Sequence, residues 1–146
     1  METARKTIEP MLDLSTVVKL SDDELSPVLG TEDAEEGVKI LLDRGVSLVL
    51  ISMGGEGAFY ATQEFDGKLP RFDIDKVVDA TGAGDAFLAA TLAHLSESSE
   101  WLSNEAVVRE AVRRGTAAGA LACTDYGAMR ALPTGEELER FMAVRN

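Results

Sequence analysis

Apolar runs alternate with segments of helical spacing along the whole chain. Residues 16–20 and 47–52 are short aliphatic runs, and the second run is apolar without alternation. A strand that is covered on both faces has this pattern. Between and after these runs, apolar residues recur every three or four positions, as in amphipathic helices. Strands that alternate with helices predict an α/β fold.

The first two predicted helices have recognisable ends. One begins at Ser21, where Glu24 stands three positions later with the spacing of a capping box, and it ends near Gly30. The other covers residues 33–44, and Gly45 is expected to cap its C-terminus because glycine tolerates left-handed backbone. Both helices therefore lie between the two predicted strands.

The rest of the chain is predicted to contain a turn, a strand and three helices. The turn at 54–57 leads into a strand at 58–61, and residues 63–78 are expected to be turn and edge strand because they contain glycine and proline. Helices are then predicted after Gly84, over 104–122, and from Thr134, which has capping-box spacing to Glu137.

Composition and charge narrow the classes of function. The chain has 146 residues and 45% hydrophobic content, so we expect a single domain over residues 1–146. Its net charge of −12 is spread along the sequence, which argues against a nucleic-acid partner. With one cysteine, no apolar leader and no long apolar stretch, the sequence predicts a soluble cytoplasmic protein without a membrane partner.

The segment 81–85 (Thr-Gly-Ala-Gly-Asp) has the pattern of an anion site at the start of a helix. Backbone N–H groups at a helix N-terminus converge on one point and favour negative charge. Beside such a site, the carboxylate of Asp85 could accept a proton from a hydroxyl that attacks a phosphoryl group. From these residues alone, the alternative is a tight turn in which Asp85 only complements the helix dipole.

A longer match favours the catalytic interpretation. Residues 78–87 (Val-Asp-Ala-Thr-Gly-Ala-Gly-Asp-Ala-Phe) closely resemble the second signature of the PfkB (ribokinase-like) carbohydrate kinases, D-T-T-G-A-G-D-x-F, with Ala80 in place of the commoner Thr. Three further segments match in the family's order: 19–25 and 119–134 resemble fructokinases in particular, and 52–58 resembles the family's T-L-G-x-x-G turn, with Ser52 and Met53 in place of Thr and Leu. The chain therefore resembles the C-terminal half of such a kinase.

The resemblance implies a fold and a reaction. The fold would be a three-layer ribokinase-like α/β fold, here only the C-terminal half of the central sheet with its flanking helices. The N-terminal half, with the lid and most sugar contacts, is expected to be absent. The implied reaction is ATP-dependent phosphorylation of a sugar hydroxyl with Mg²⁺ and K⁺. Fructose is the leading acceptor, and the substrates, nucleotide and sugar, are the implied partners.

Several alternatives stay open. Other acceptors in the family are ribose, 2-keto-3-deoxygluconate, a sugar phosphate or a nucleoside. A non-catalytic nucleotide- or anion-binding fragment is the alternative from another class. The isolated chain is expected to be weakly active or inactive because it would lack the acceptor pocket, and an exposed sheet edge would favour a homo-oligomer or another partner.

The resemblance also implies roles for single residues. Asp85 would be the catalytic base, and three amides would hold the transferred phosphoryl group: those of Gly82, Ala83 and Gly84. The expected nucleotide-binding residues are Gly54, Gly57, Thr81, Thr116 and Gly119. Glu24 would order water around Mg²⁺, and Asp79, with Thr81, would help to bind a monovalent cation.

Each of these roles has a structural alternative. Gly54 and Gly57 also suit a plain hairpin turn, and the small residues around Thr116 suit close helix packing. Glu24 has the spacing of a capping box. Asp79 and Thr81 have the spacing of a turn closed by an Asx hydrogen bond.

Overall fold

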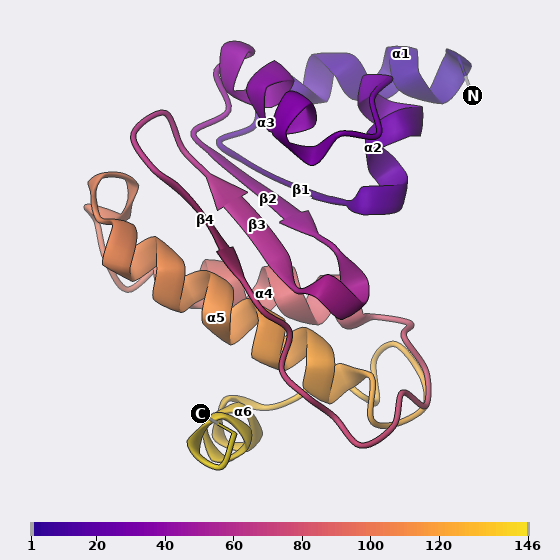
Figure 1. Cartoon of the computed structure of the whole chain (residues 1–146), viewed down its shortest axis with the longest axis vertical. Helices are drawn as coiled ribbons and strands as arrows, with labels where there is room; N and C mark the ends of the chain where they lie inside the picture. Colours follow the sequence, from indigo (N-terminus) through magenta and orange to yellow (C-terminus); the bar gives the residue numbers. More distant parts are fainter. Residues whose placement is uncertain (1, 146) are drawn as a thin grey trace. The chain divides into compact units, whose positions relative to one another are not determined.

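The computed structural model describes residues 2–145, which divide into two compact units (Figure 1). The first unit contains the described residues up to Gly54, together with Ala58–Lys68. The second contains Gly55–Gly57 and the described residues from Leu69 onward. Each unit has its own helices and its own cluster of buried side chains.

The first unit is a four-stranded sheet with helices on one face. Its elements are α1 (Glu2–Leu12), β1 (Val17–Ser21), α2 (Asp22–Leu29), α3 (Ala34–Asp43), β2 (Leu48–Ser52), β3 (Ala58–Ala61) and β4 (Asp66–Leu69). The strand order is β1-β2-β3-β4, with β1 parallel and β3 antiparallel to β2. Figure 1 shows α1, α2 and α3 on the same side of this sheet.

Alternating strand residues build the core beneath these helices. Val18, Val49 and Ile51 belong to the same buried cluster as Leu25 of α2 and Leu41 of α3. The intervening residues of β2 are buried as well, so that its four apolar residues, from Leu48 to Ile51, are all 0% exposed. The prediction of a buried strand within 47–52 is confirmed for its apolar residues, while Ser47 and Ser52 at its ends are partly buried.

Helix ends in the first unit follow the expected chemistry. The N–H of Ser21 donates to the Glu24 carboxylate at 2.7 Å, as the capping-box spacing predicted. Gly45 has φ +96°, and the N–H groups of Gly45 and Val46 donate to the carbonyls of Leu42 and Leu41. These two bonds form a Schellman motif. The C-cap residue of α3 is Arg44, and Gly45, the next residue, has the left-handed conformation that ends the helix.

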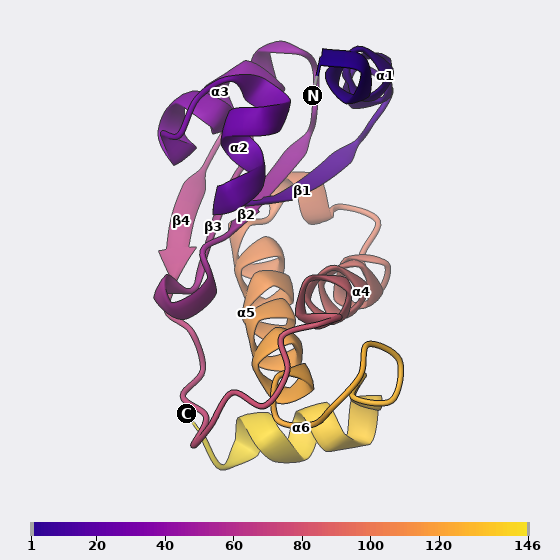
Figure 2. The ribbon, with the colours of Figure 1, turned by 90° about the vertical axis from the view of Figure 1, so that its right-hand side faces the viewer.

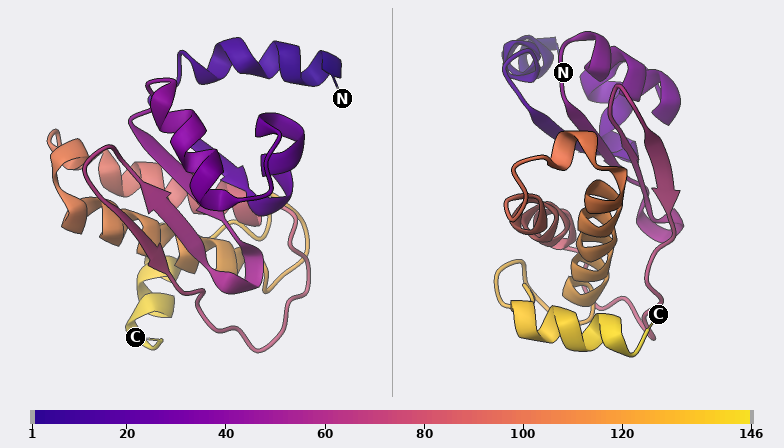
Figure 3. Two further views of the ribbon diagram at one scale, coloured as in Figure 1. Left: turned by 45° about the horizontal axis from the view of Figure 1, so that its top comes forward. Right: turned by 90° about the vertical axis from the view of Figure 1, so that its left-hand side faces the viewer.

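The second unit is helical. It contains α4 (Ala83–Leu95), the short 3₁₀ turn η2 (Trp101–Ser103), α5 (Glu105–Ala122) and α6 (Gly135–Ala143). Another 3₁₀ turn, η1 (Gly54–Glu56), links β2 to β3. Helices α4 and α5 lie side by side, and α6 crosses the C-terminal end of α5 (Figures 2 and 3).

Small residues bring α4 and α5 into close contact. A Cβ added at Gly115 would lie 2.9 Å from the carbonyl oxygen of Phe87 and would also collide with the Thr91 hydroxyl. That hydroxyl donates to the Phe87 carbonyl at 2.8 Å, and Thr91 is fully buried. The backbones of the two helices can therefore approach each other, which fixes the beginning of α4 against α5.

Candidate functional site

The turn before α4 requires glycine. Gly82 has φ +86°, and its carbonyl accepts the first helical hydrogen bond, from Ala86 at 2.9 Å. A Cβ at this position would lie 2.7 Å from the carbonyl oxygen of Ala128. Both the backbone conformation and the neighbouring loop therefore exclude a side chain here.

The start of α4 presents unpaired N–H groups. Within residues 2–145, the amides of Gly82, Gly84 and Asp85 donate to no protein acceptor. The amide of Ala83, which the sequence suggested as a further donor, already donates to the carbonyl of Ala80 at 3.1 Å. Three free donors at the positive end of a 13-residue helix can bind an anionic group.

The Asp85 carboxylate lies in the first turn of this helix. Its side chain is exposed, and within the described chain it takes part in no hydrogen bond or ion pair. A carboxylate without such a partner keeps all of its lone pairs for a ligand. The structure thus brings a free acceptor and free N–H donors together at one end of α4.

Asp79 joins two parts of the chain. Its Oδ1 accepts hydrogen bonds from the amide of Thr81 at 2.9 Å and from the Thr81 hydroxyl at 2.7 Å. Its Oδ2 accepts a third, from the amide of Gly127 at 3.0 Å. The hydroxyl of Thr81, then the two amides, hold the pKa of the Asp79 carboxyl below its usual value. The Asx turn proposed from spacing is present, with an added long-range bond.

The loop at 123–128 runs beside this turn, and the sequence analysis did not assign it a role. The carbonyl of Cys123 accepts a hydrogen bond from the amide of Val78 at 2.8 Å. Burial, and to a smaller degree the charge of Asp79, raise the pKa of the Cys123 thiol. Gly127, at φ +90°, and Asp125 are the turn-forming residue types that could have indicated this loop.

Residues of α5 pack against the beginning of α4, next to the turn. A Cβ at Gly119 would come within 3.1 Å of the Ala83 carbonyl oxygen, so α5 lies directly against the beginning of α4. Thr116 is 8% exposed, and its hydroxyl donates to the carbonyl of Arg113 at 2.8 Å. Close packing is therefore observed at both positions, and nucleotide contact at either one stays a prediction.

The glycines around η1 differ in their surroundings. Gly57 is buried at φ +98°, and a Cβ there would lie 2.7 Å from the carbonyl carbon of Pro70. The close approach that it permits is thus that of the chain itself. Gly54, at φ +48°, is exposed, and no atom would lie within 4 Å of its Cβ. Only Gly54 leaves space for a ligand to approach the backbone.

The expected metal residues do not form a preassembled site. Glu24, on α2, is exposed and caps its own helix. No group of three or more His, Cys, Asp or Glu side chains that could hold a metal gathers within residues 2–145. A cation near Asp79 would therefore need backbone oxygens or its own water and phosphate ligands.

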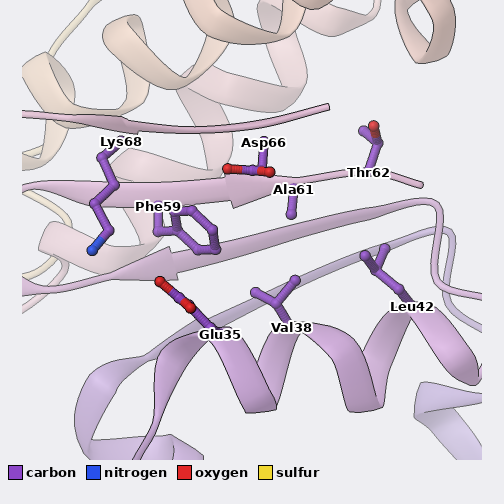
Figure 4. A pocket seen from close by; sticks show the side chains of 8 residues that line it. All are labelled: Glu35, Val38, Leu42, Phe59, Ala61, Thr62, Asp66 and Lys68. Carbon is purple, nitrogen blue, oxygen red and sulfur yellow. The ribbon is translucent and has the colours of Figure 1, made fainter. Parts of the chain in front are cut away.

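The first unit also contains a groove. It has a volume of ≈ 420 Å³ and runs between α3 and the hairpin of β3 and β4 (Figure 4). Phe59 and Val38 line it, and Glu35 and Lys68 stand at one end. None of the residues singled out from the sequence lines this groove.

Across residues 2–145, no helix is long and apolar enough to span a membrane.

Comparisons with known proteins agree on one family. Residues 1–135 match the pfkB family carbohydrate kinase description. The chain is 35% identical over 142 residues to probable fructokinase-4 of Arabidopsis thaliana, covering 97% of the chain and 43% of that protein.

Solved structures show the same relationship. A fructokinase double mutant from Vibrio cholerae O395, bound to fructose, ADP and potassium ion, matches with a TM-score of 0.86 and 37% identity over 94% of the chain and 44% of its own. A putative ribokinase II from E. coli, in complex with ATP and Mg²⁺, matches with a TM-score of 0.85 and 26% identity. The match covers 97% of this chain and 43% of the E. coli chain.

Proposed function

Because the chain belongs to the pfkB family of carbohydrate kinases, we propose that it forms the part of an ATP-dependent sugar kinase that holds the transferred phosphoryl group. The predicted family and the partial ribokinase-like α/β fold are both confirmed. The chain spans less than half the length of the relatives it matches, 43% for the Arabidopsis fructokinase. The proposal therefore concerns the phosphoryl and nucleotide side of the reaction.

The observation that carries the proposal is the start of α4. There the free amides of Gly82, Gly84 and Asp85 lie beside an unpaired carboxylate. In phosphoryl transfer, charge develops on the oxygens of the transferred group, and fixed N–H donors stabilise it without reorganisation. The Asp85 carboxylate is the group that accepts the proton of the attacking sugar hydroxyl. The anion site thus receives the phosphoryl group and Asp85 activates the acceptor.

Nucleotide and cations are proposed by the same reasoning. Mg²⁺ would neutralise phosphate charge as part of the nucleotide complex. Glu24 is proposed to order water around this ion, and its bond to Ser21 leaves lone pairs of the carboxylate free. A carboxylate has about four lone-pair sites, and Asp79 uses three for hydrogen bonds. Asp79 therefore has room for one bond to a monovalent cation such as K⁺.

The proposed acceptor is fructose. Fructokinases are among both the matched sequences and the matched structures, and one of these structures contains fructose. Ribose, 2-keto-3-deoxygluconate, a sugar phosphate and a nucleoside remain the alternatives within the family. Self-association, or association with another partner, through an exposed edge of the sheet also stays a prediction, and the edge strands are β1 and β4.

The competing proposal is a fragment that binds nucleotide or another anion without transferring phosphate. The two differ in the use of Asp85, because a free carboxylate beside an anion site repels the ligand, and a non-catalytic fragment would keep it only for its interaction with the helix dipole. Its presence next to the free amides favours a catalytic part. We propose that the isolated chain binds nucleotide weakly and is weakly active or inactive by itself.

Calorimetry with Mg-ATP tests this proposal on the chain itself. The chain should give a binding heat at millimolar nucleotide. Gly82→Ala should abolish it, since the new Cβ would lie 2.7 Å from the Ala128 carbonyl oxygen at a backbone angle that favours glycine. Gly135→Ala is the matched control, because Gly135 has no neighbour within 4 Å of its Cβ. An unchanged heat in Gly82→Ala would show that the anion site is assigned wrongly.

A further inference from the structure

Two segments of the second unit lie along each other at the candidate site. The turn, residues 78–82, precedes α4, and the brace, residues 123–128, follows α5. Backbone bonds connect them at one end, where the amide of Val78 donates to the carbonyl of Cys123 at 2.8 Å. At the other end Gly82 lies against Ala128, which leaves no space for a Cβ.

Between these two contacts stands a single side chain. Asp79 accepts two hydrogen bonds from Thr81 within the turn and one, at 3.0 Å, from the amide of Gly127 in the brace. Among residues 2–145, no other side chain forms a hydrogen bond between the turn and the brace. Ala80 and Thr81, which lie between Asp79 and Gly82, are exposed, so the Asp79 side chain is the attachment of this part of the turn to the brace.

We propose that Asp79 is a positioning residue. By holding the turn to the brace, it keeps Gly82 in its left-handed conformation and so aims the free amides of Gly82, Gly84 and Asp85 at the phosphoryl group. This role goes beyond that of a cation ligand, since the three hydrogen bonds form in the protein alone. Its consequence for ligand binding rests on the function proposed above.

The geometry distinguishes between substitutions at this position. Asp79→Asn can keep an oxygen towards Thr81, but its amide group then meets the N–H of Gly127 as a second donor. In this orientation only the side-chain bond to the brace is lost, and the backbone bonds to Cys123 remain. Asp79→Ala removes all three bonds. Thr81→Val removes the hydroxyl donor alone, and Thr81→Ser keeps it.

The test combines amide hydrogen exchange, amide chemical shifts and Mg-ATP calorimetry on the full chain. Asp79→Asn should speed exchange at Gly127 while leaving Thr81 protected, and it should shift the amide signals of Gly84 and Asp85. Mg-ATP binding should weaken by up to about tenfold, because the nucleotide must then order the part of the turn that this hydrogen bond ordered before. Asp75→Asn makes the same change of charge at an exposed neighbour and should leave all three measurements unchanged.

Loss of stability alone must be separated from loss of positioning. Val38→Ala destabilises the core of the first unit, where Val38 is 6% exposed, and should leave the Gly84 and Asp85 signals unchanged. If Asp79→Asn fails to fold, Thr81→Val should give the same shifts in weaker form, and Thr81→Ser should restore them.

The outcomes separate this inference from the proposed function. Faster exchange at Gly127 without a change in the Gly84 and Asp85 amide signals would overturn the positioning role, whether or not Mg-ATP binding weakens. Shifted signals in a chain that binds no Mg-ATP would support the positioning role and contradict the proposed function instead.

Discussion

The ring of Tyr60 on β3 lies over Gly67 on the neighbouring strand β4. A Cβ at Gly67 would come within 2.7 Å of the ring carbon that bears the hydroxyl. The aromatic ring thus covers the backbone that a glycine leaves open in a strand. Tyr60 is 0% exposed, and its hydroxyl has no hydrogen-bond partner among the described residues.

Tyr60→Phe should therefore stabilise the protein. The substitution keeps the ring over Gly67 and removes a buried hydroxyl that lacks a partner, whose burial costs about 1 kcal/mol or more. We expect the free energy of unfolding, measured by urea denaturation, to rise by about 1 kcal/mol. Tyr126→Phe is the control, because Tyr126 is 71% exposed, and it should change stability by less than about 0.5 kcal/mol. A destabilised Tyr60→Phe would mean that the hydroxyl has an acceptor.

Gly57→Ala and Gly54→Ala should differ in their effect on stability. Both glycines have positive φ, which alone costs a side chain about 1 kcal/mol. At Gly57 the new methyl group also meets the backbone of Pro70 and Arg71. We expect a loss of about 3 kcal/mol or more there, against about 1 kcal/mol at the open position Gly54. Thermal or urea unfolding measures both, and equal losses would contradict the close approach at Gly57.

The capping box of α6 should make stability depend on pH. The amide and hydroxyl of Thr134 donate to Glu137 at 2.8 and 2.7 Å and lower the pKa of that carboxyl. A carboxyl whose pKa is lower in the folded state stabilises the fold above its unfolded pKa. This contribution is lost as the pH falls through the folded pKa, so the effect lies in the acid range, below the ordinary glutamate pKa of 4.5.

Glu137→Gln should accordingly reduce the loss of stability between neutral and acidic pH. Urea unfolding at a series of pH values measures the slope of the free energy of unfolding against pH. Glu105→Gln is the matched control, because Glu105 also stands in the first turn of a helix but accepts no capping bond within the described residues. If the two variants show the same slope, the pH dependence does not come from the capping box.

Most of the fold could be predicted from local pattern. The buried strand at β2 follows from an uninterrupted aliphatic run, and the end of α3 follows from Gly45. Helix α1 was not predicted, because Pro10 lies inside it and, among its residues 6–12, the apolar side chains that pack on the core cluster are Ile8 and Leu12. Its support comes from tertiary packing, which a local pattern does not contain.

The site was predictable where it is local in sequence. The glycine turn and Asp85 were found from consecutive residues, and the structure places them together at the start of α4. The bond from Gly127 to Asp79 was not predictable, because 48 residues separate its partners. Likewise, the donation from Ala83 to Ala80 depends on the turn geometry rather than on residue type.

The central claim is that Asp85 is the base of a phosphoryl transfer, and turnover tests it most directly. In a chimera, this chain replaces the matching segment of the Vibrio cholerae fructokinase, of which it covers 44%. The chimera should phosphorylate fructose, and its Asp85→Asn variant should lose roughly 10²- to 10⁴-fold in kcat with nearly unchanged Mg-ATP binding. Asp75→Asn should keep full turnover. An inactive chimera, or an Asp85→Asn variant that works at the original rate, would contradict the claim.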